Sequence, residues 1–109
     1  MKIKIILPVQ SQRALKKLGS DIKDARIKRR ISTVLLSKKT GISRITLAKI
    51  EKGNPYVSIG AYANIIFILG MTDKLYKMLD PSQDNKGNTL EKQRTPKRIR
   101  YKKNEGELF

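Results

Sequence analysis

The segment TGISRITLAKIEKG (residues 40–53) holds side chains whose types and spacing are suited to recognition of a partner. If the segment is helical, the apolar residues Leu47 and Ile50 share one face. The other faces then carry two cations, a hydroxyl and a further apolar side chain: Arg44, Ile45, Thr46 and Lys49. A helix divided in this way is fixed to its protein by one face, and the question is what the other faces meet.

The charge of the chain indicates the kind of partner. The 25 Lys and Arg residues outnumber the 9 Asp and Glu residues, which gives a formal net charge of +16 and a pI near 10.4. Charge of one sign repels itself in a compact state, and a polyanionic partner relieves that repulsion. The composition therefore favours a nucleic acid, or less often an anionic membrane surface.

Two residue types that often carry catalysis and metal binding are missing. The chain has no His and no Cys, so it lacks the commonest general base at neutral pH, thiolate ligands and disulfides. The sequence also shows no acid–base or nucleophile constellation. We therefore expect no enzyme activity, no metal and no cofactor.

The length of 109 residues predicts one small domain with a modest core. The apolar run in MKIKIILP is too short for a signal peptide and is interrupted by Pro8. No segment approaches the roughly 20 apolar residues of a membrane-spanning helix. These features predict a cytoplasmic protein with no membrane partner.

The first predicted helix begins near Val9, where apolar residues start to recur at spacings of three and four. Its apolar stripe consists of Leu15, Leu18, Ile22 and Ala25. Gly19 weakens the middle, so the stretch is one helix or two with a break there. The run RIKRR (26–30) ends it with cations, which suit a helix C-terminus and are in part simply solvated.

Small polar residues and a glycine mark the next two helices. Ser32 can cap a helix over residues 33–40, and Gly41, which can take a positive φ, ends it. Ser43 can cap the following helix, which reaches about Lys52.

Two more helices are expected before Pro81. Ser58 can cap a helix over residues 59–69 that is apolar nearly all round, and we expect it to be the buried central helix. Thr72 can cap a last helix that Pro81 stops. That helix carries the apolar residues Leu75, Tyr76 and Leu79.

The two ends of the chain differ from its middle. Residues 1–8 alternate between lysine and isoleucine at Lys2, Ile3, Lys4 and Ile5, which favours a short strand or a pairing arm, with a disordered start as the alternative. After Pro81 large apolar residues are few, so we expect a disordered tail whose block RTPKRIRYKK (94–103) suits a polyanion.

The two helices on either side of Gly41 have the apolar spacing of a helix-turn-helix, set by Leu36, Ile42, Leu47 and Ile50. The stretch from LGSDIKDARIKRRIS through GISRITLAKIEKG to NPYVSIGAYANIIFILG resembles the Xre/Cro–C1 helix-turn-helix family over about residues 18–80. One departure is Thr33, where that family usually has glutamine, and this puts one phosphate or base contact in doubt.

The resemblance implies an all-α fold and its boundaries. The family fold is a compact, lambda-repressor-like bundle of about five helices that binds operators as a dimer. The DNA-binding domain would cover residues 18–80, after a flexible N-terminal arm and helix extension at residues 1–17. Residues 81–109 would be a basic, disordered tail.

The resemblance also implies roles for individual residues. The family's base-reading positions fall on Arg44, Ile45 and Lys49, where arginine can bind a guanine bidentately and isoleucine can meet a thymine methyl. Its phosphate-contacting positions fall on Thr33, Ser43, Thr46 and Asn54. Cations of the tail would contact DNA without sequence preference, or a partner: Arg94, Lys97, Arg98 and Arg100.

A narrower resemblance concerns partners. NPYVSIGAYANIIFILG (54–70), followed by TPKRIR (95–100), is similar to HipB-like antitoxins, which bind HipA-type kinase toxins and repress their own operon. It implies three partners: operator DNA, a second copy of the chain and a HipA-like kinase. A third small protein can join this complex, and the location implied is the bacterial nucleoid. The apolar residues Ile3, Ile5 and Leu7, and those of the last helix, are candidate dimer surfaces.

Other functions remain open from the sequence. One is a phage-type or stand-alone Xre regulator without a toxin, and another is a protein that mainly docks on a kinase. A sequence-tolerant RNA-binding protein is less favoured, because two Phe and four Tyr supply few stacking aromatics.

Overall fold

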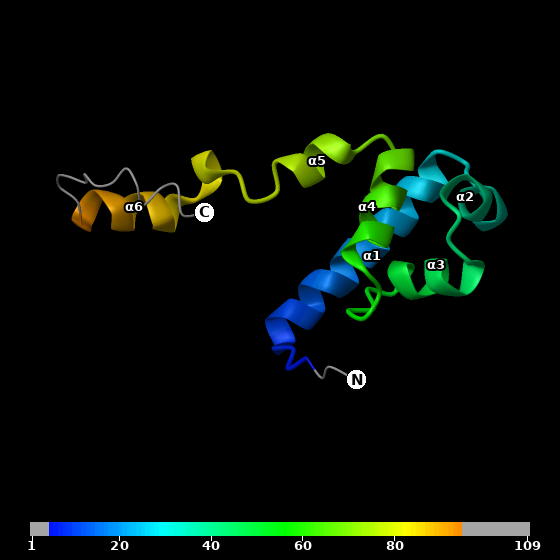
Figure 1. Cartoon of the computed structure of the whole chain (residues 1–109), viewed down its shortest axis with the longest axis horizontal. Coiled ribbons are helices and arrows are strands. Elements are labelled where there is room, and N and C mark those ends of the chain that lie inside the picture. The colour runs from blue at the N-terminus through cyan, green and yellow to red at the C-terminus, as the bar shows by residue number, and fades with distance from the viewer. Residues whose placement is uncertain (1–4, 95–109) are drawn as a thin grey trace, which may run out of the picture. The chain divides into compact units, whose positions relative to one another are not determined.

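The computed structural model describes residues 5–94, and every regular element in that range is helical (Figure 1). The helices are α1 (Val9–Lys28), α2 (Thr33–Thr40), α3 (Arg44–Glu51), α4 (Ile59–Ile68), α5 (Thr72–Tyr76) and α6 (Asn85–Arg94), with a 3-10 helix η1 (Pro81–Gln83) before α6. The all-α prediction is confirmed. Residues 1–75 and 76–109 form two units, and each is described by itself.

The predicted N-terminal strand is not formed in the part of the arm that the structure describes. Residues 5–8 have no regular secondary structure, and residues 1–4 lie outside the described range. The carbonyl oxygen of Leu7 accepts a hydrogen bond from Gln12 Nε2 at 2.9 Å, which ties the arm to the first turns of α1. The helix α1 also crosses the predicted boundary between residues 17 and 18.

Gly19 does not break α1, which is continuous from Val9 to Lys28. A Cβ at Gly19 would lie 2.5 Å from the Ile50 carbonyl oxygen and 2.6 Å from the Gly53 nitrogen, distances that no real side chain tolerates. The glycine therefore lets α1 approach the end of α3 more closely than any larger residue would. This approach explains a residue that by helix propensity alone is unfavourable.

Part of the basic run at the end of α1 is structural. Arg26 donates to both carboxylate oxygens of Glu51, at 2.7 and 3.2 Å, and to the Ile31 carbonyl at 3.0 Å. The two paired side chains are only 11% and 10% exposed, so Arg26 is not one of the solvated cations of this run. Removing one partner of a buried ion pair typically costs about 3–5 kcal/mol, because the other charge stays buried.

The predicted caps of α2, α3 and α4 are confirmed. Ser32, Ser43 and Ser58 each accept a hydrogen bond through the side-chain oxygen from the backbone N–H three residues on, at 3.0, 3.1 and 3.1 Å. Gly41 ends α2 with a φ of 75°, as a C-terminal glycine in the left-handed region does.

The core of the first unit draws on four helices and the residue that follows the fourth. Its buried apolar residues are Ile22, Leu36, Leu47, Ile50, Tyr62, Ile65 and Leu69. Within the unit, α1 packs against α3, and α2 packs against both α3 and α4. The core thus fixes α3 on two sides, which leaves its remaining face to solvent.

The helix α4, expected to be the buried central helix, is buried on one face only. Only Tyr62 and Ile65 of this helix are buried, while Ile59 is 72% and Phe67 64% exposed. A small unit has too little interior to enclose a helix on every side, so one face of α4 packs on the core and the other does not.

The C-terminal elements also differ from the prediction. Thr72 begins α5 rather than capping it, and α5 ends at Tyr76, so Leu79 lies beyond the helix. In the second unit, Asp84 accepts from the Gly87 N–H at 2.9 Å and starts α6, so residues 85–94 are helical where a disordered tail was expected. A capping carboxylate with helix-favouring Lys, Leu, Glu and Gln explains this helix without a core.

Candidate nucleic-acid interface

The helix α3 presents the predicted base-contacting residues to solvent. Leu47 and Ile50 are 1% and 0% exposed and hold the helix to the core. Arg44 and Lys49 are exposed, and Ile45 is 72% exposed although its side chain is apolar. Since Ile45 and Lys49 are four residues apart, they lie on the same helix face. The division of this helix into a packed and an open face is therefore confirmed.

The turn before α3 is held by side-chain hydrogen bonds. Ser37 Oγ donates to the Ile42 carbonyl at 2.6 Å. Thr40 Oγ1 donates to the Leu36 carbonyl at 2.8 Å and accepts from the Ile42 N–H at 3.2 Å. These bonds fix the angle at which α3 leaves α2.

The hydroxyl residues predicted to touch phosphates lie at helix starts. Thr33 is the first residue of α2 and is half-buried. Ser43 Oγ donates to Thr46 Oγ1 at 3.1 Å, and Thr46 is half-buried, so these two hydroxyls already serve the cap of α3. A phosphate contact from any of the three stays a prediction.

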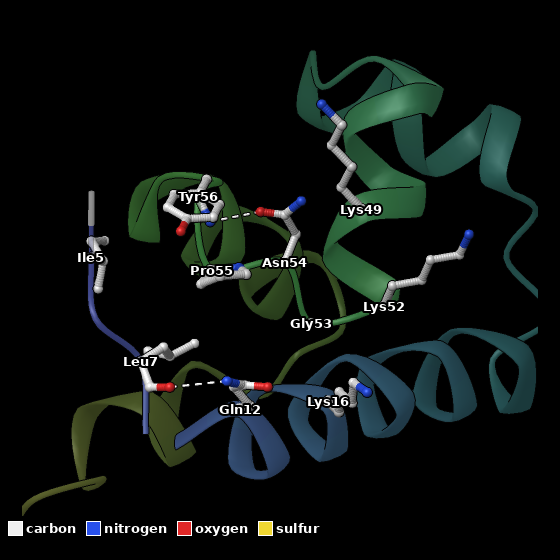
Figure 2. Close-up of a pocket in the computed structure, with 10 residues that line it drawn as sticks. All are labelled: Ile5, Leu7, Gln12, Lys16, Lys49, Lys52, Gly53, Asn54, Pro55 and Tyr56. Atoms are coloured by element: carbon white, nitrogen blue, oxygen red, sulfur yellow. Dashed lines mark hydrogen bonds between the residues drawn. The ribbon is translucent and has the colours of Figure 1, made fainter. Parts of the chain in front are cut away.

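Asn54, the fourth predicted phosphate contact, lies in the loop after α3. Its side-chain oxygen accepts from the Tyr56 N–H at 2.6 Å, and its carbonyl accepts from the Tyr62 hydroxyl at 2.7 Å. Burial raises the pKa of Tyr62, which keeps the phenol protonated as a donor. Because the oxygen of the Asn54 amide is taken, its NH₂ group is the part left to donate outward (Figure 2).

A pocket of about 450 Å³ opens beside this loop. Its walls come from the arm, α1, the end of α3 and the following loop: Ile5, Leu7, Gln12, Lys16, Lys49, Lys52, Gly53, Asn54, Pro55 and Tyr56. In Figure 2 the apolar residues of the arm and of the loop lie on one side, and the three lysines lie on the other. Lys16 and Lys52 were not among the contacts predicted from the sequence. For Lys52 the sequence offers one indication, its three-residue spacing from Lys49. For Lys16 it offers none, because that residue reaches the pocket only through the packing of α1 against α3.

The surface around α3 has little negative charge. Glu51 is the single acidic residue between Arg26 and Asp73, and its carboxylate is buried against Arg26. The helices α2 and α3 therefore present exposed cations, and neither helix carries an exposed carboxylate to neutralise them. Such a surface attracts phosphates over distances set by the ionic strength.

The other predicted contacts lie away from this unit or outside the description. Arg94 is the last residue of α6, whereas Lys97, Arg98 and Arg100 fall beyond the described residues. Within residues 5–94 no three His, Cys, Asp or Glu side chains are grouped as a metal site would need. No helix in that range has both the length and the apolar content to cross a membrane.

No family model matches the chain, and a search of curated proteins finds no relative. Any functional assignment therefore depends on the residues and their geometry.

Proposed function

We propose that this chain binds double-stranded DNA through α3 and represses transcription, with α2 and α3 as a helix-turn-helix of the Xre/Cro–C1 type. The observation that carries the proposal is the open face of α3. This helix exposes Arg44, Ile45 and Lys49, and its one carboxylate, that of Glu51, is buried in an ion pair. Arginine suits guanine, and an exposed isoleucine suits a thymine methyl, in a major groove that admits a helix.

The packing of the first unit supports a compact helix-turn-helix bundle. The helices α1 to α4 share one core, and Gly41 with the hydrogen-bonded turn sets α3 against α2. A recognition helix needs this rigidity, because base contacts depend on the position of its backbone. The five-helix count of the resembled family stays a prediction, since α5 buries no residue.

Arg44→Ala tests the proposal. A duplex selected by the protein from a randomised pool should bind the variant about 1–3 kcal/mol more weakly, with relaxed preference at one base pair per half-site. Gel shifts measure the loss on this duplex and on random DNA. Lys17→Ala is the matched control, because Lys17 is an exposed cation of α1 that pairs with Asp21. An equal loss on both duplexes for Arg44→Ala would make it a phosphate contact.

A two-fold dimer is part of the proposal, because one helix-turn-helix touches too few base pairs to select a site in a genome. We expect light scattering to give about twice 12.4 kDa for the protein on its selected duplex, after subtraction of the DNA. Of the candidate dimer contacts, Ile5 and Tyr76 are exposed and Leu7 is half-buried. The exposed apolar residues of α4 are a further candidate dimer surface. One copy per duplex at every protein concentration would contradict the dimer.

The antitoxin role, with a HipA-like kinase and a third small protein as partners, and the cytoplasmic location stay predictions from the sequence. Co-purification with the product of the neighbouring gene distinguishes an antitoxin from a phage-type or stand-alone regulator. A kinase that co-purifies while Arg44→Ala leaves DNA binding unchanged would favour a protein that mainly docks on a kinase.

A further inference from the structure

We propose that the pocket beside the end of α3 binds one stretch of the DNA sugar–phosphate backbone and sets affinity without reading sequence. We call it the backbone clamp, made by Lys16, Lys52 and the Asn54 amide. The inference rests on the proposed function, because it assumes that α3 lies against DNA. It adds two lysines that were not among the contacts predicted from the sequence.

The close packing of α1 on the loop after α3 brings the two lysines to one rim. Gly53 has a φ of 77°, and a Cβ there would collide with the Leu15 carbonyl and lie 2.7 Å from Lys16 Cα. The backbone of Gly53 therefore sits directly on that of Lys16. Lys52 precedes Gly53, so residues 36 positions apart in sequence line the same pocket.

The charges of this pocket have one sign. Lys16, Lys49 and Lys52 line it, and none of its lining residues is acidic. The carboxylates nearest in sequence are engaged elsewhere, Asp21 with Lys17 at 2.7 Å and Glu51 with Arg26. Three ammonium groups around one space repel each other, and a phosphate between them removes that repulsion.

The polar groups of the pocket are arranged for an acceptor. Lysines only donate, and the Asn54 amide presents its NH₂ group because its oxygen holds the Tyr56 N–H. A phosphodiester offers acceptors only. On the other side, Leu7, Pro55 and Tyr56 form an apolar wall that suits the carbon face of a deoxyribose, and Gln12 holds the arm in place through its bond to Leu7.

The position of the pocket connects it to α3. Lys49 is both a lining residue of the pocket and an exposed residue of α3. A DNA strand with a phosphate at Lys52 therefore borders the groove in which Lys49 would face the bases. Contacts of this kind position a protein on the duplex and carry no sequence information.

The double variant Lys16→Gln/Lys52→Gln tests the clamp on a random duplex of about 20 base pairs, with fluorescence anisotropy from about 50 to 200 mM salt. Each phosphate contact contributes about 0.9 to the slope of log K against log salt, so the slope should fall by about 1.8. The ratio of affinities for the selected and random duplexes should stay constant. Lys16→Arg/Lys52→Arg should keep the slope of the wild type.

The matched control is Lys17→Gln/Lys74→Gln, which removes the same charge from lysines that are 75% and 73% exposed and line no part of this pocket. Its slope should change far less than that of the clamp variant, and thermal unfolding should show all variants folded. An unchanged slope in the clamp variant, or a fall in the affinity ratio instead, overturns the clamp. Failure of the wild type to bind any duplex would reject the proposed function itself.

Discussion

Tyr62 links the core to the binding loop through one hydrogen bond. The side chain is 6% exposed, and its hydroxyl donates to the Asn54 carbonyl at 2.7 Å. The same residue thus fills the core and fixes the residue that presents an amide to the pocket. A phenol in this position keeps its proton longer than one in water, because burial penalises the charged form.

Tyr62→Phe should lower the free energy of unfolding by about 1 kcal/mol near neutral pH, because the Asn54 carbonyl loses its donor. The substitution should also make the free energy of unfolding less sensitive to alkaline pH. Burial raises the pKa of Tyr62 above the ordinary 10.0, so its contribution is complete below that value and is lost as pH rises through the raised pKa. Urea unfolding on both sides of this range should show a smaller loss in the variant than in the wild type. Equal losses would contradict a role for this phenol.

At the scale of elements, the α1–α3 junction depends on two glycines for different reasons. Gly19 lies inside a helix and is needed for space, whereas Gly53 combines a φ of 77° with contact against the backbone of Leu15 and Lys16. Gly41 has a similar φ of 75°, yet nothing lies within 4 Å of where its Cβ would be. An added Cβ at Gly41 would meet only the cost of a positive φ, whereas at Gly53 it would also collide with the neighbouring backbone.

Gly53→Ala should therefore destabilise the protein by about 3 kcal/mol or more, since an alanine adds a backbone collision to the cost of a positive φ. Gly41→Ala, the control, should cost only about 1–2 kcal/mol, which is the cost of the φ alone. Urea unfolding of both variants measures the difference. Similar losses in the two variants would show that α1 and the loop separate easily, and would weaken the geometry of the backbone clamp.

The elements that the sequence predicted well are those with local signals. Serine caps and the Gly41 terminus are decided within four residues, so α2, α3 and the start of α4 were predictable. The face of α3 followed from the period of Leu47 and Ile50. Residues 5–8 of the arm form no strand, and residues 5–94 offer no other strand for them to pair with, whereas Lys2, Ile3 and Lys4 lie outside the described residues.

The features that the sequence did not predict depend on residues far apart in the chain. Arg26 pairs with Glu51, 25 positions away, whereas the local sequence shows only a basic run that suits a helix C-terminus and is in part solvated. Gly19 was suspected of breaking α1, because no local pattern shows that another backbone passes beside it. The pocket was not predicted for the same reason. Lys16 and Lys52 line it together only because α1 packs closely on the end of α3 and the loop that follows.

At the scale of the whole molecule, the charge of +16 is divided between two units. In the first unit, packed helices hold the cations in fixed positions, and this allows both sequence reading by α3 and the backbone clamp. The block RTPKRIRYKK lies in the second unit, and all of it after Arg94 is outside the described residues. Cations outside a base-reading element add affinity and salt dependence but little specificity.

Deleting residues 95–109 should therefore flatten the salt dependence of DNA binding by about 0.9 in slope for each phosphate that the segment contacts. It should weaken binding to selected and random duplexes alike, and it should preserve the ranking of selected sequences, because α3 stays in place. Fluorescence anisotropy over a salt series measures both effects. The deletion removes two acidic and five basic residues, so a matched control replaces Lys97, Arg98 and Arg100 by glutamine and keeps the length. An unchanged slope together with lost binding of the neighbouring gene product would assign the segment to a protein partner instead of DNA.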